Sequence, residues 1–207
     1  QVASTAFNGK VSNLRITHQA LYLNKYSVYF SGHSSRPYLL STSSDYSPGT
    51  GDFTMESWVS IDEISSNTTD GIFQLSSTSG AFTYGGIAVL YKNSYRWEMY
   101  GGNNTNAGSA AIDTSYVYGD WAHVAVVKTN SKIKLYVNGK EVISDDDTQN
   151  YTGYQYLGLG AAFSSTHAFK GRLSNFKYTK GQALYTANFV PSTEPLTTTS
   201  QGSTASN

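Results

Sequence analysis

The amino-acid sequence predicts an all-β protein built as a sandwich of two antiparallel sheets. No window of a dozen residues places apolar side chains at the i, i+3, i+4 and i+7 spacing of an amphipathic helix. Short runs of alternating apolar and polar residues, rich in Val, Ile, Tyr, Phe and Thr, occur along most of the chain. Gly, Asn and Ser separate these runs at intervals of about 8–12 residues, which is typical of sandwiches.

The expected strands follow from these runs in chain order. The clearest is 53–61, whose odd positions are mostly apolar and whose even positions carry Thr, Glu, Trp and Ser. Asn138-Gly139 predicts a tight hairpin, because a type I′ turn needs positive φ at both central residues. A second hairpin is expected around Thr129-Asn130-Ser131. The full set of expected strands is 27–30, 38–40, 53–61, 71–75, 86–91, 95–100, 121–128, 132–137, 141–143, 156–159 and 169–178.

Composition excludes several classes of protein. The chain has 207 residues, 14 Lys+Arg, 14 Asp+Glu and no cysteine. The absence of cysteine excludes disulfides, zinc ribbons and thiol nucleophiles, and zero net charge argues against nucleic-acid binding. No apolar run approaches the roughly 18 residues of a membrane-spanning helix, so no membrane insertion is expected. A surface poor in charge and rich in Tyr and hydroxyl groups is typical of secreted or virion-exposed β proteins.

An internal repeat bears on domain organisation. Residues 7–22 (FNGKVSNLRITHQALY) match 169–185 (FKGRLSNFKYTKGQALY) with one gap opposite Gly181, about 162 residues away. We expect a tandem array: 1–22 end a preceding copy, 23–190 form a complete domain, and 191–207 are a Ser/Thr-rich linker or flexible tail. The alternative is one domain with two pseudo-equivalent strands. The start at Gln1, without a signal-peptide pattern, fits a processed chain or a segment of a longer one.

Three ordered blocks, 27–59, 119–142 and 169–185, resemble the laminin-G-like, concanavalin A-like jelly-roll family. Within them, GDFTMESWV (51–59), WAHVA (121–125), LYVNG (135–139) and FKGRLSN (169–175) match the family's patterns. The resemblance implies a concanavalin A-like, two-sheet antiparallel jelly-roll β-sandwich. The segment ALYTANFVPSTEPLT (183–197) is similar to copies in structural proteins of tailed bacteriophages, which implies a multi-domain fibre or appendage.

The matched residues have structural roles to fill first. His123 lies in an alternating strand and is expected to be a hydrogen-bonded structural histidine. Gly171 is expected to let two strands approach closely. The residues expected to fill the core are Phe53, Trp58, Trp121, Leu135, Val137 and Phe169.

Catalytic patterns are absent from the sequence. The resemblance includes glycoside hydrolases, whose retaining members hold two carboxyl groups about 5 Å apart, on one strand in this superfamily. Glu56 has no acidic residue two or four positions away, and a strand would point Asp62 and Glu63 to opposite faces. There is no Gly-x-Ser-x-Gly elbow, His-Glu-x-x-His motif or P-loop. The chain is therefore expected not to be an enzyme.

Metal binding has one candidate. Many related domains bind calcium at the sandwich rim, and calcium prefers several oxygen ligands. The family's Phe-Asp-Gly is Phe30-Ser31-Gly32 here, which removes one ligand. Asp145 and Asp147, in the only dense acidic cluster, are the candidate calcium ligands, and a solvated loop is the alternative; no other cofactor is expected.

Two segments combine aromatic rings with amides and hydroxyls, the mixture that binds sugars in sandwiches. The alternative for both is ordinary structure, with Trp97 in the core and the tyrosines at the rim. Tyr151 and Tyr154 lie in a Gly/Thr/Asn loop, where binding residues are often found. The candidate glycan-binding residues are Tyr95, Trp97, Tyr100, Asn103 and Asn104 in the first segment and Tyr151 and Tyr154 in the second.

The sequence thus predicts a non-catalytic binding module at a virion surface or in an extracellular protein. The expected function is adhesion to a cell-surface glycan, strengthened by multivalency in a tandem array or homo-oligomer. One alternative is a structural spacer or decoration domain that contacts neighbouring virion subunits. Another is an unusual glycoside hydrolase.

Overall fold

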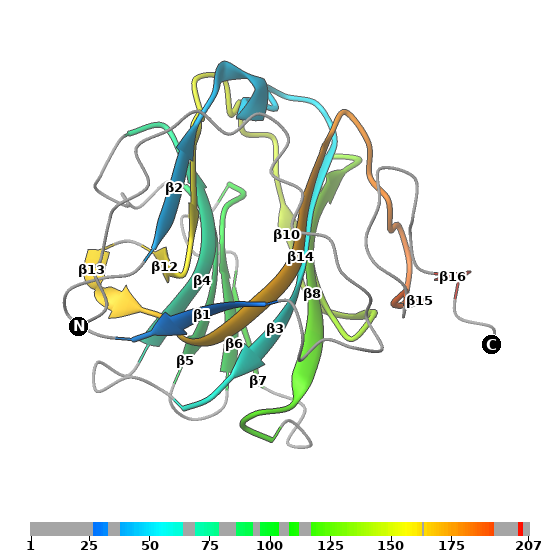
Figure 1. The fold of residues 1–207 in the computed structure, drawn as a ribbon. Coiled ribbons are helices and arrows are strands. Elements are labelled where there is room, and N and C mark those ends of the chain that lie inside the picture. Colours follow the sequence, from blue (N-terminus) through cyan, green and yellow to red (C-terminus); the bar gives the residue numbers. More distant parts are fainter. Residues whose placement is uncertain are drawn as a thin grey trace.

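The chain folds into two sheets stacked face to face (Figure 1). The structure, a computed structural model, describes residues 27–32, 38–63, 69–78, 86–92, 96–103, 108–111, 117–162, 164–192 and 203–204. These residues form strands and one short 3₁₀ helix, η2 (Ser44–Tyr46). No helix among them is long and apolar enough to cross a membrane. The predicted antiparallel β-sandwich is confirmed.

The first sheet has six antiparallel strands. Its order is β1 (Val28–Ser31), β14 (Lys170–Lys180), β3 (Phe53–Ile61), β8 (Trp121–Thr129), β9 (Lys132–Val137) and β10 (Lys140–Asp146). β1 therefore pairs with β14, the last strand of this sheet in chain order, and β14 lies between β1 and β3.

The second sheet has eight strands. Its main path is β12 (Ala161–Ala162), β13 (Ser164–Ala168), β4 (Thr69–Ser76), β5 (Ile87–Lys92), β6 (Arg96–Tyr100) and β7 (Gly108–Ala111). β11 (Tyr156–Leu159) pairs with β4, and β2 (Leu39–Thr42) pairs with β11. A small third sheet joins β15 (Phe189–Val190) to β16 (Ser203–Thr204).

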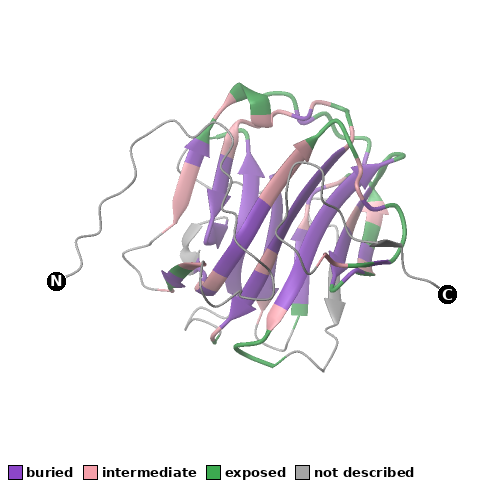
Figure 2. Ribbon diagram, turned by 45° about the vertical axis from the view of Figure 1, so that its right-hand side comes forward, coloured by how far each residue is buried: buried purple, intermediate pink, exposed green. Residues whose placement is uncertain are grey.

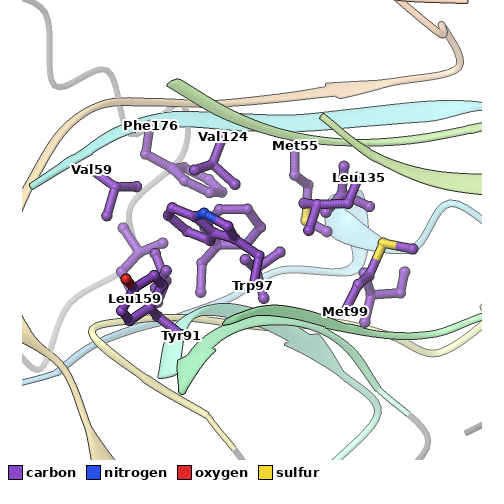
Figure 3. Close-up of a cluster of buried hydrophobic side chains, with 14 of the residues drawn as sticks. Met55, Val59, Tyr91, Trp97, Met99, Val124, Leu135, Leu159 and Phe176 are labelled. Carbon is purple, nitrogen blue, oxygen red and sulfur yellow. The ribbon is translucent and has the colours of Figure 1, made fainter. Parts of the chain in front are cut away.

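The core lies between the two sheets, and most strand residues are buried (Figure 2). Alternation explains this arrangement, because every second residue of a strand faces the opposite sheet. In Figure 3, Trp97 of β6 points across the core toward Val124 of β8 and Phe176 of β14. The Trp97 ring meets Tyr91 edge to face, with centroids 5.1 Å apart.

The core prediction was right for Phe53, Leu135, Val137 and Phe169 and wrong for two tryptophans. Trp58 and Trp121 are only half-buried and lie on the outer face of the six-stranded sheet. Strand parity explains the error, because Phe53 and Trp58 are five positions apart on β3 and must point to opposite faces.

Residues 181–192, here called the clasp, follow β14 and cross the outer face of the six-stranded sheet. Ala183, Leu184, Tyr185 and Phe189 of the clasp form a cluster with Ala125, Val127 and Tyr136 of β8 and β9. The backbone N–H of Phe189 donates to the carbonyl of Gly139 at 2.9 Å. The clasp thus closes over the Asn138-Gly139 turn, whose φ angles of 49° and 77° confirm the predicted hairpin.

Replacing Gly139 by Ala is expected to destabilise the protein more than the same change at Gly119. Both glycines have positive φ, so each substitution costs about 1–2 kcal/mol of backbone strain. A Cβ at position 119 would meet open space, whereas one at position 139 would lie 1.8 Å from the Phe189 carbonyl oxygen and displace the clasp. Urea denaturation of the two variants measures this difference, and equal losses would show that the clasp does not rest on the turn.

Candidate functional site

The two segments singled out for sugar binding meet at one rim of the sandwich. The backbone N–H of Asn103 donates to the carbonyl of Asp146 at 2.9 Å. The N–H of Gly102 donates to the Tyr151 hydroxyl, also at 2.9 Å. We call residues 101–103 and 145–154 the rim site.

Two adjacent glycines make this approach possible. Gly101 and Gly102 have φ angles of 133° and 77°, which L side chains rarely adopt. A Cβ on Gly102 would lie 2.9 Å from the Asp146 carbonyl oxygen and 3.1 Å from a methyl of Ile133. The end of β6 can therefore lie directly against the end of β10.

The floor of the rim site is a buried polar cluster. The Tyr151 hydroxyl donates to Asp147 Oδ2 at 3.0 Å, and Lys128 Nζ lies 3.1 Å from Asp147 Oδ1. The same ammonium donates to the Gln149 carbonyl at 2.8 Å and lies 4.7 Å from the centre of the Tyr151 ring. Burial and the negative charge of Asp147 raise the pKa of Tyr151 far above its usual value, which keeps the hydroxyl a donor.

This cluster changes the role expected for Tyr151 and Asp147. Tyr151 is 2% exposed and Asp147 is 1% exposed, so neither forms a solvated loop or an open sugar platform. Asp147 already accepts from Lys128 and Tyr151, so its oxygens are not available to calcium. Asp145 and Asp146 belong to β10, not to a loop. Among the described residues no three acidic, His or Cys side chains gather as a metal site.

Two matching Asn–Thr pairs form the exposed surface above this floor. Asn103 Oδ1 accepts from the N–H and the hydroxyl of Thr148, at 2.8 and 2.9 Å. Asn150 Oδ1 accepts from the N–H and the hydroxyl of Thr152, at 3.0 and 2.7 Å. These bonds fix the orientation of both amides. Each Nδ2 group, without a hydrogen-bond partner among the described residues, is held as an exposed donor beside a hydroxyl whose lone pairs accept.

Tyr154 supplies the aromatic part of the rim site. Its half-buried ring stands edge to face on Tyr151, with centroids 5.0 Å apart and an interplanar angle of 85°. Burial and Asp147 raise its pKa above the usual value for tyrosine. The rim loop itself is fixed from below, since Ser47 Oγ donates to the Tyr151 carbonyl and accepts from the N–H of Gly153.

The other predicted glycan-binding residues lie elsewhere. Trp97 is 1% exposed and belongs to the core, so it cannot be a sugar platform. Tyr100 packs on Ala88, Leu90 and Ala162 at the outer face of the eight-stranded sheet. Tyr95 and Asn104 lie outside the described residues.

Sequence reasoning missed Lys128, Thr148, Thr152 and Ser47. Only Lys128 gave a signal: it continues the inward-facing series Ala122, Val124 and Val126 of β8. A lysine at an inward position of a strand implies a buried acceptor.

Removing the Tyr151 hydroxyl is expected to lower the free energy of unfolding by about 1–3 kcal/mol, because Tyr151→Phe leaves the buried Asp147 oxygen and the Gly102 N–H each short of a partner. Urea denaturation measures the loss. Tyr156→Phe, which removes the hydroxyl of a half-buried tyrosine at the start of β11, serves as the matched control. Equal losses in the two variants would contradict the role given to the floor cluster.

A second buried cluster lies under the clasp. Glu56 Oε2 is 3.1 Å from His123 Nε2 and accepts from the Tyr185 hydroxyl at 2.7 Å, while Oε1 is 3.4 Å from Lys177 Nζ. Burial alone would raise the pKa of Glu56, but the hydrogen bond and charge of His123, with Tyr185 and Lys177, hold it below its usual value. Trp58 meets His123 edge to face at 5.4 Å.

This Glu56 cluster has the chemistry of an anchor. Glu56 and His123 are both 0% exposed, and the Tyr185 and Phe189 rings of the clasp stack on each other above the sheet, 3.6 Å apart. Thr54 adds two bonds, since its hydroxyl donates to the Gln182 carbonyl and accepts from the N–H of Leu184. As predicted, His123 is hydrogen-bonded within the structure.

Comparisons with known proteins agree with this architecture. A sequence profile of the concanavalin A-like lectin/glucanases superfamily matches residues 33–182. No curated protein sequence matches the chain.

Several solved structures share the fold. One is the native heptameric SAP-like pentraxin of Limulus polyphemus (TM-score 0.57, 16% identity, 73% of this chain and 74% of that one covered). Another is domain 4 of the extracellular arabinanase AbnA of Geobacillus stearothermophilus, in complex with arabinotriose (TM-score 0.56, 17% identity, 76% and 71% covered). A third is the mouse laminin α1 chain, domains LG4-5 (TM-score 0.52, 13% identity, 76% and 41% covered). With the family profile covering most of the sandwich, the chain belongs to the concanavalin A-like lectin/glucanase superfamily as a laminin-G-like jelly-roll domain.

Proposed function

We propose that the chain is a non-catalytic glycan-binding module and that the rim site is where the glycan binds. The observation that carries this proposal is the pair of fixed amides, Asn103 and Asn150, each held by a threonine through its Oδ1. The fold supports it, because it is the fold of carbohydrate-binding domains, and the structural relative from the arabinanase was solved with arabinotriose.

The chemistry of a sugar suits this arrangement. Each sugar hydroxyl both donates and accepts, so it binds best beside a fixed donor and a fixed acceptor. The Nδ2 groups of Asn103 and Asn150 are the donors, and the hydroxyls of Thr148 and Thr152 are the acceptors. The ring edge of Tyr154 offers an apolar contact for the C–H groups of the sugar. Because the loop is already ordered, little conformational entropy is lost on binding.

The absence of catalysis is part of the proposal. A hydrolytic acid must reach the glycosidic oxygen. Glu56, a buried carboxylate whose pKa is held below its usual value, lies under the clasp. In the rim site Asp147 is fully engaged by Lys128 and Tyr151. Release of reducing sugar from a bound polysaccharide by the purified protein would overturn the proposal that the module is non-catalytic.

The setting of the module is proposed to be a virion surface or another extracellular surface. The low charge, the lack of cysteine and the resemblance of residues 183–197 to tailed-phage structural proteins support this setting. In a homo-oligomer or array, several weak rim sites would act together on one surface. Contact with neighbouring subunits through a structural surface is the second candidate function, favoured by the internal repeat of residues 7–22 and 169–185.

A glycan array with wild-type protein and isosteric variants tests the proposal. Asn103→Asp and Asn150→Asp keep the accepting Oδ1 and remove the donor, and each is expected to weaken binding about tenfold, the value of one good hydrogen bond. Asn188→Asp is the matched control, because Asn188 is also exposed and accepts a backbone N–H, that of Glu141, but lies in the clasp. Absence of any glycan binding by the wild type, or an equal loss in the control, would contradict the rim site.

A further inference from the structure

The structure shows the role of the residues in the second copy of the internal repeat. Residues 169–185 comprise β14 and the first part of the clasp. Residues 7–22 lie outside the described residues. Several of the positions at which the two copies are identical are positions where the structure restricts the residue type. This inference is independent of the proposed glycan site.

Two positions at the start of the segment are restricted in residue type. Phe169, matched by Phe7, is 0% exposed and packs against Phe30 with ring centroids 5.9 Å apart. Gly171, matched by Gly9, has φ 153°, and a Cβ there would lie 2.2 Å from the Ser60 carbonyl oxygen. No other residue type fits that close approach of β14 to β3.

The middle of the segment contains a bulge. Ser174 and Asn175, matched by Ser12 and Asn13, lie at the register shift between β14 and β3. Asn175 has φ 55° and is 1% exposed, and asparagine is the non-glycine residue that best tolerates this conformation. The Ser174 carbonyl accepts from the Ser57 hydroxyl at 3.0 Å.

The end of the segment holds the clasp to the sheet. Gln182, Ala183, Leu184 and Tyr185 are matched by Gln19, Ala20, Leu21 and Tyr22. In the structure these residues supply both bonds to Thr54, the apolar contacts with β8 and β9, and the hydroxyl that donates to Glu56. Lys177, whose ammonium faces Glu56, is replaced in the first copy by the cation Arg15.

The copies differ at several positions, among them the turn that follows β14. Gly181, opposite the gap, has φ 81° with nothing within 4 Å of a Cβ, and its N–H donates to the Asp52 carbonyl at 2.7 Å. Leu173 and Phe176, which face the core, become Val11 and Leu14 and stay apolar. Residues 7–22 thus keep the close-approach glycine, the bulge residues and the clasp residues, although Ile16 stands where the Tyr178 hydroxyl donates to the Tyr46 carbonyl.

We propose that residues 7–22 are a second strand-and-clasp segment and that they complete another sandwich of the same fold. In the sandwich described here, β14 already pairs with β3 from Gly171 to Lys180 and with β1 from Lys170 to Leu173, so the place of this strand beside β3 is taken. The partner is therefore a second copy of this domain. Its chemistry is set by the segment: it must present a threonine and a glutamate where Thr54 and Glu56 stand here, to receive the main chain of Gln19 and Leu21 and the hydroxyl of Tyr22.

A designed tandem chain tests the proposal. Residues 23–168, a sandwich without its last strand, are placed directly before Phe7 of the chain, so that residues 7–22 are the only segment that can complete the upstream copy. The downstream copy keeps its own β14 and serves as the internal control. The expected result is two folded domains, with an unfolding amplitude in circular dichroism about twice that of the single domain. Trypsin is then expected to leave two resistant bodies.

Two variants of the tandem chain sharpen the test. Gly9→Val with Tyr22→Ala is expected to unfold the upstream copy alone and to halve the unfolding amplitude. A tandem carrying the sequence of 169–185 in place of 7–22 is the positive control. An upstream copy that folds with 169–185 but is degraded with 7–22 would overturn the proposal, and so would an upstream copy that is unaffected by Gly9→Val with Tyr22→Ala.

Discussion

Replacing Glu56 by Ala is expected to lower the free energy of unfolding by about 3–5 kcal/mol, because one change removes a partner of the buried His123 and Tyr185 side chains and of the partly buried Lys177 ammonium. His123 Nε2, the Tyr185 hydroxyl and Lys177 Nζ all face this carboxylate. The loss is expected to appear first in the clasp, which Tyr185 fastens to the sheet. Urea denaturation gives the free energy, and limited proteolysis after residue 180 gives the local effect.

Glu56→Gln is the conservative variant for this test. Its amide oxygen can still accept from Tyr185, but it carries no charge to balance Lys177, so an intermediate loss is expected. Tyr185→Phe is expected to loosen the clasp with a smaller loss, since only one hydrogen bond is removed. Full stability of Glu56→Ala, with an unaltered proteolysis pattern, would contradict the anchoring role.

The same carboxylate gives an acid dependence whose sign follows from its pKa. The pKa of Glu56 is lower in the folded protein than the usual value of 4.5. Its stabilising contribution is therefore fully present above about pH 4.5 and is lost as the pH falls through the lowered folded value. The wild type is expected to lose its stability advantage over Glu56→Gln in that acid range. Urea denaturation of both proteins between pH 7 and pH 3 measures how far the difference between their free energies of unfolding decreases.

Replacing Trp97 by Ala is the second change with a large expected effect, about 3–5 kcal/mol of unfolding free energy. The indole is 1% exposed and packs on Tyr91 across from Val124 and Phe176, so its removal leaves a cavity between the sheets (Figure 3). Trp97→Phe keeps a ring in the same place and is expected to lose much less. The midpoint of urea denaturation should fall while its slope stays constant.

Loss of glycan binding without loss of stability would show that Trp97 acts as a ligand platform. A Trp97→Ala protein with wild-type stability and abolished glycan binding would place the indole at the surface, against the structure. Binding by Trp97→Phe at wild-type strength, in a folded protein, is the result consistent with a core residue.

Much of the fold could be predicted from local pattern. Asn138-Gly139 predicts its turn because few residues adopt positive φ. The alternation of 53–61 assigns each residue of this strand to one face of the sheet. Trp58 was misassigned because a large aromatic residue suggests a core position, although its parity on β3 places it outside. Trp97 is a large aromatic residue and also occupies a core-facing position of β6. The many polar residues around it in the sequence nevertheless suggested a binding surface.

The candidate site could be predicted only in outline. Composition pointed to one segment that contains Asn103 and another that contains Tyr151 and Tyr154, and the structure joins the two, but their contacts depend on Lys128 and Ser47 from distant segments. The Glu56 cluster was not foreseen, because it needs β3, β8 and β14 in register and the clasp folded back over them. Such contacts arise from tertiary pairing, which single-sequence patterns do not encode.

The most direct test of the rim site follows the side-chain amide signals of the ¹⁵N-labelled protein in NMR spectra during titration with the oligosaccharide that the array selects. If the glycan binds at the rim site, the Nδ2 signals of Asn103 and Asn150 shift and saturate together, while that of Asn188 in the clasp stays in place. Unchanged Asn103 and Asn150 signals, with shifts at the indole N–H groups of Trp58 and Trp121, would place the ligand on the outer face of the six-stranded sheet and contradict binding at the rim site.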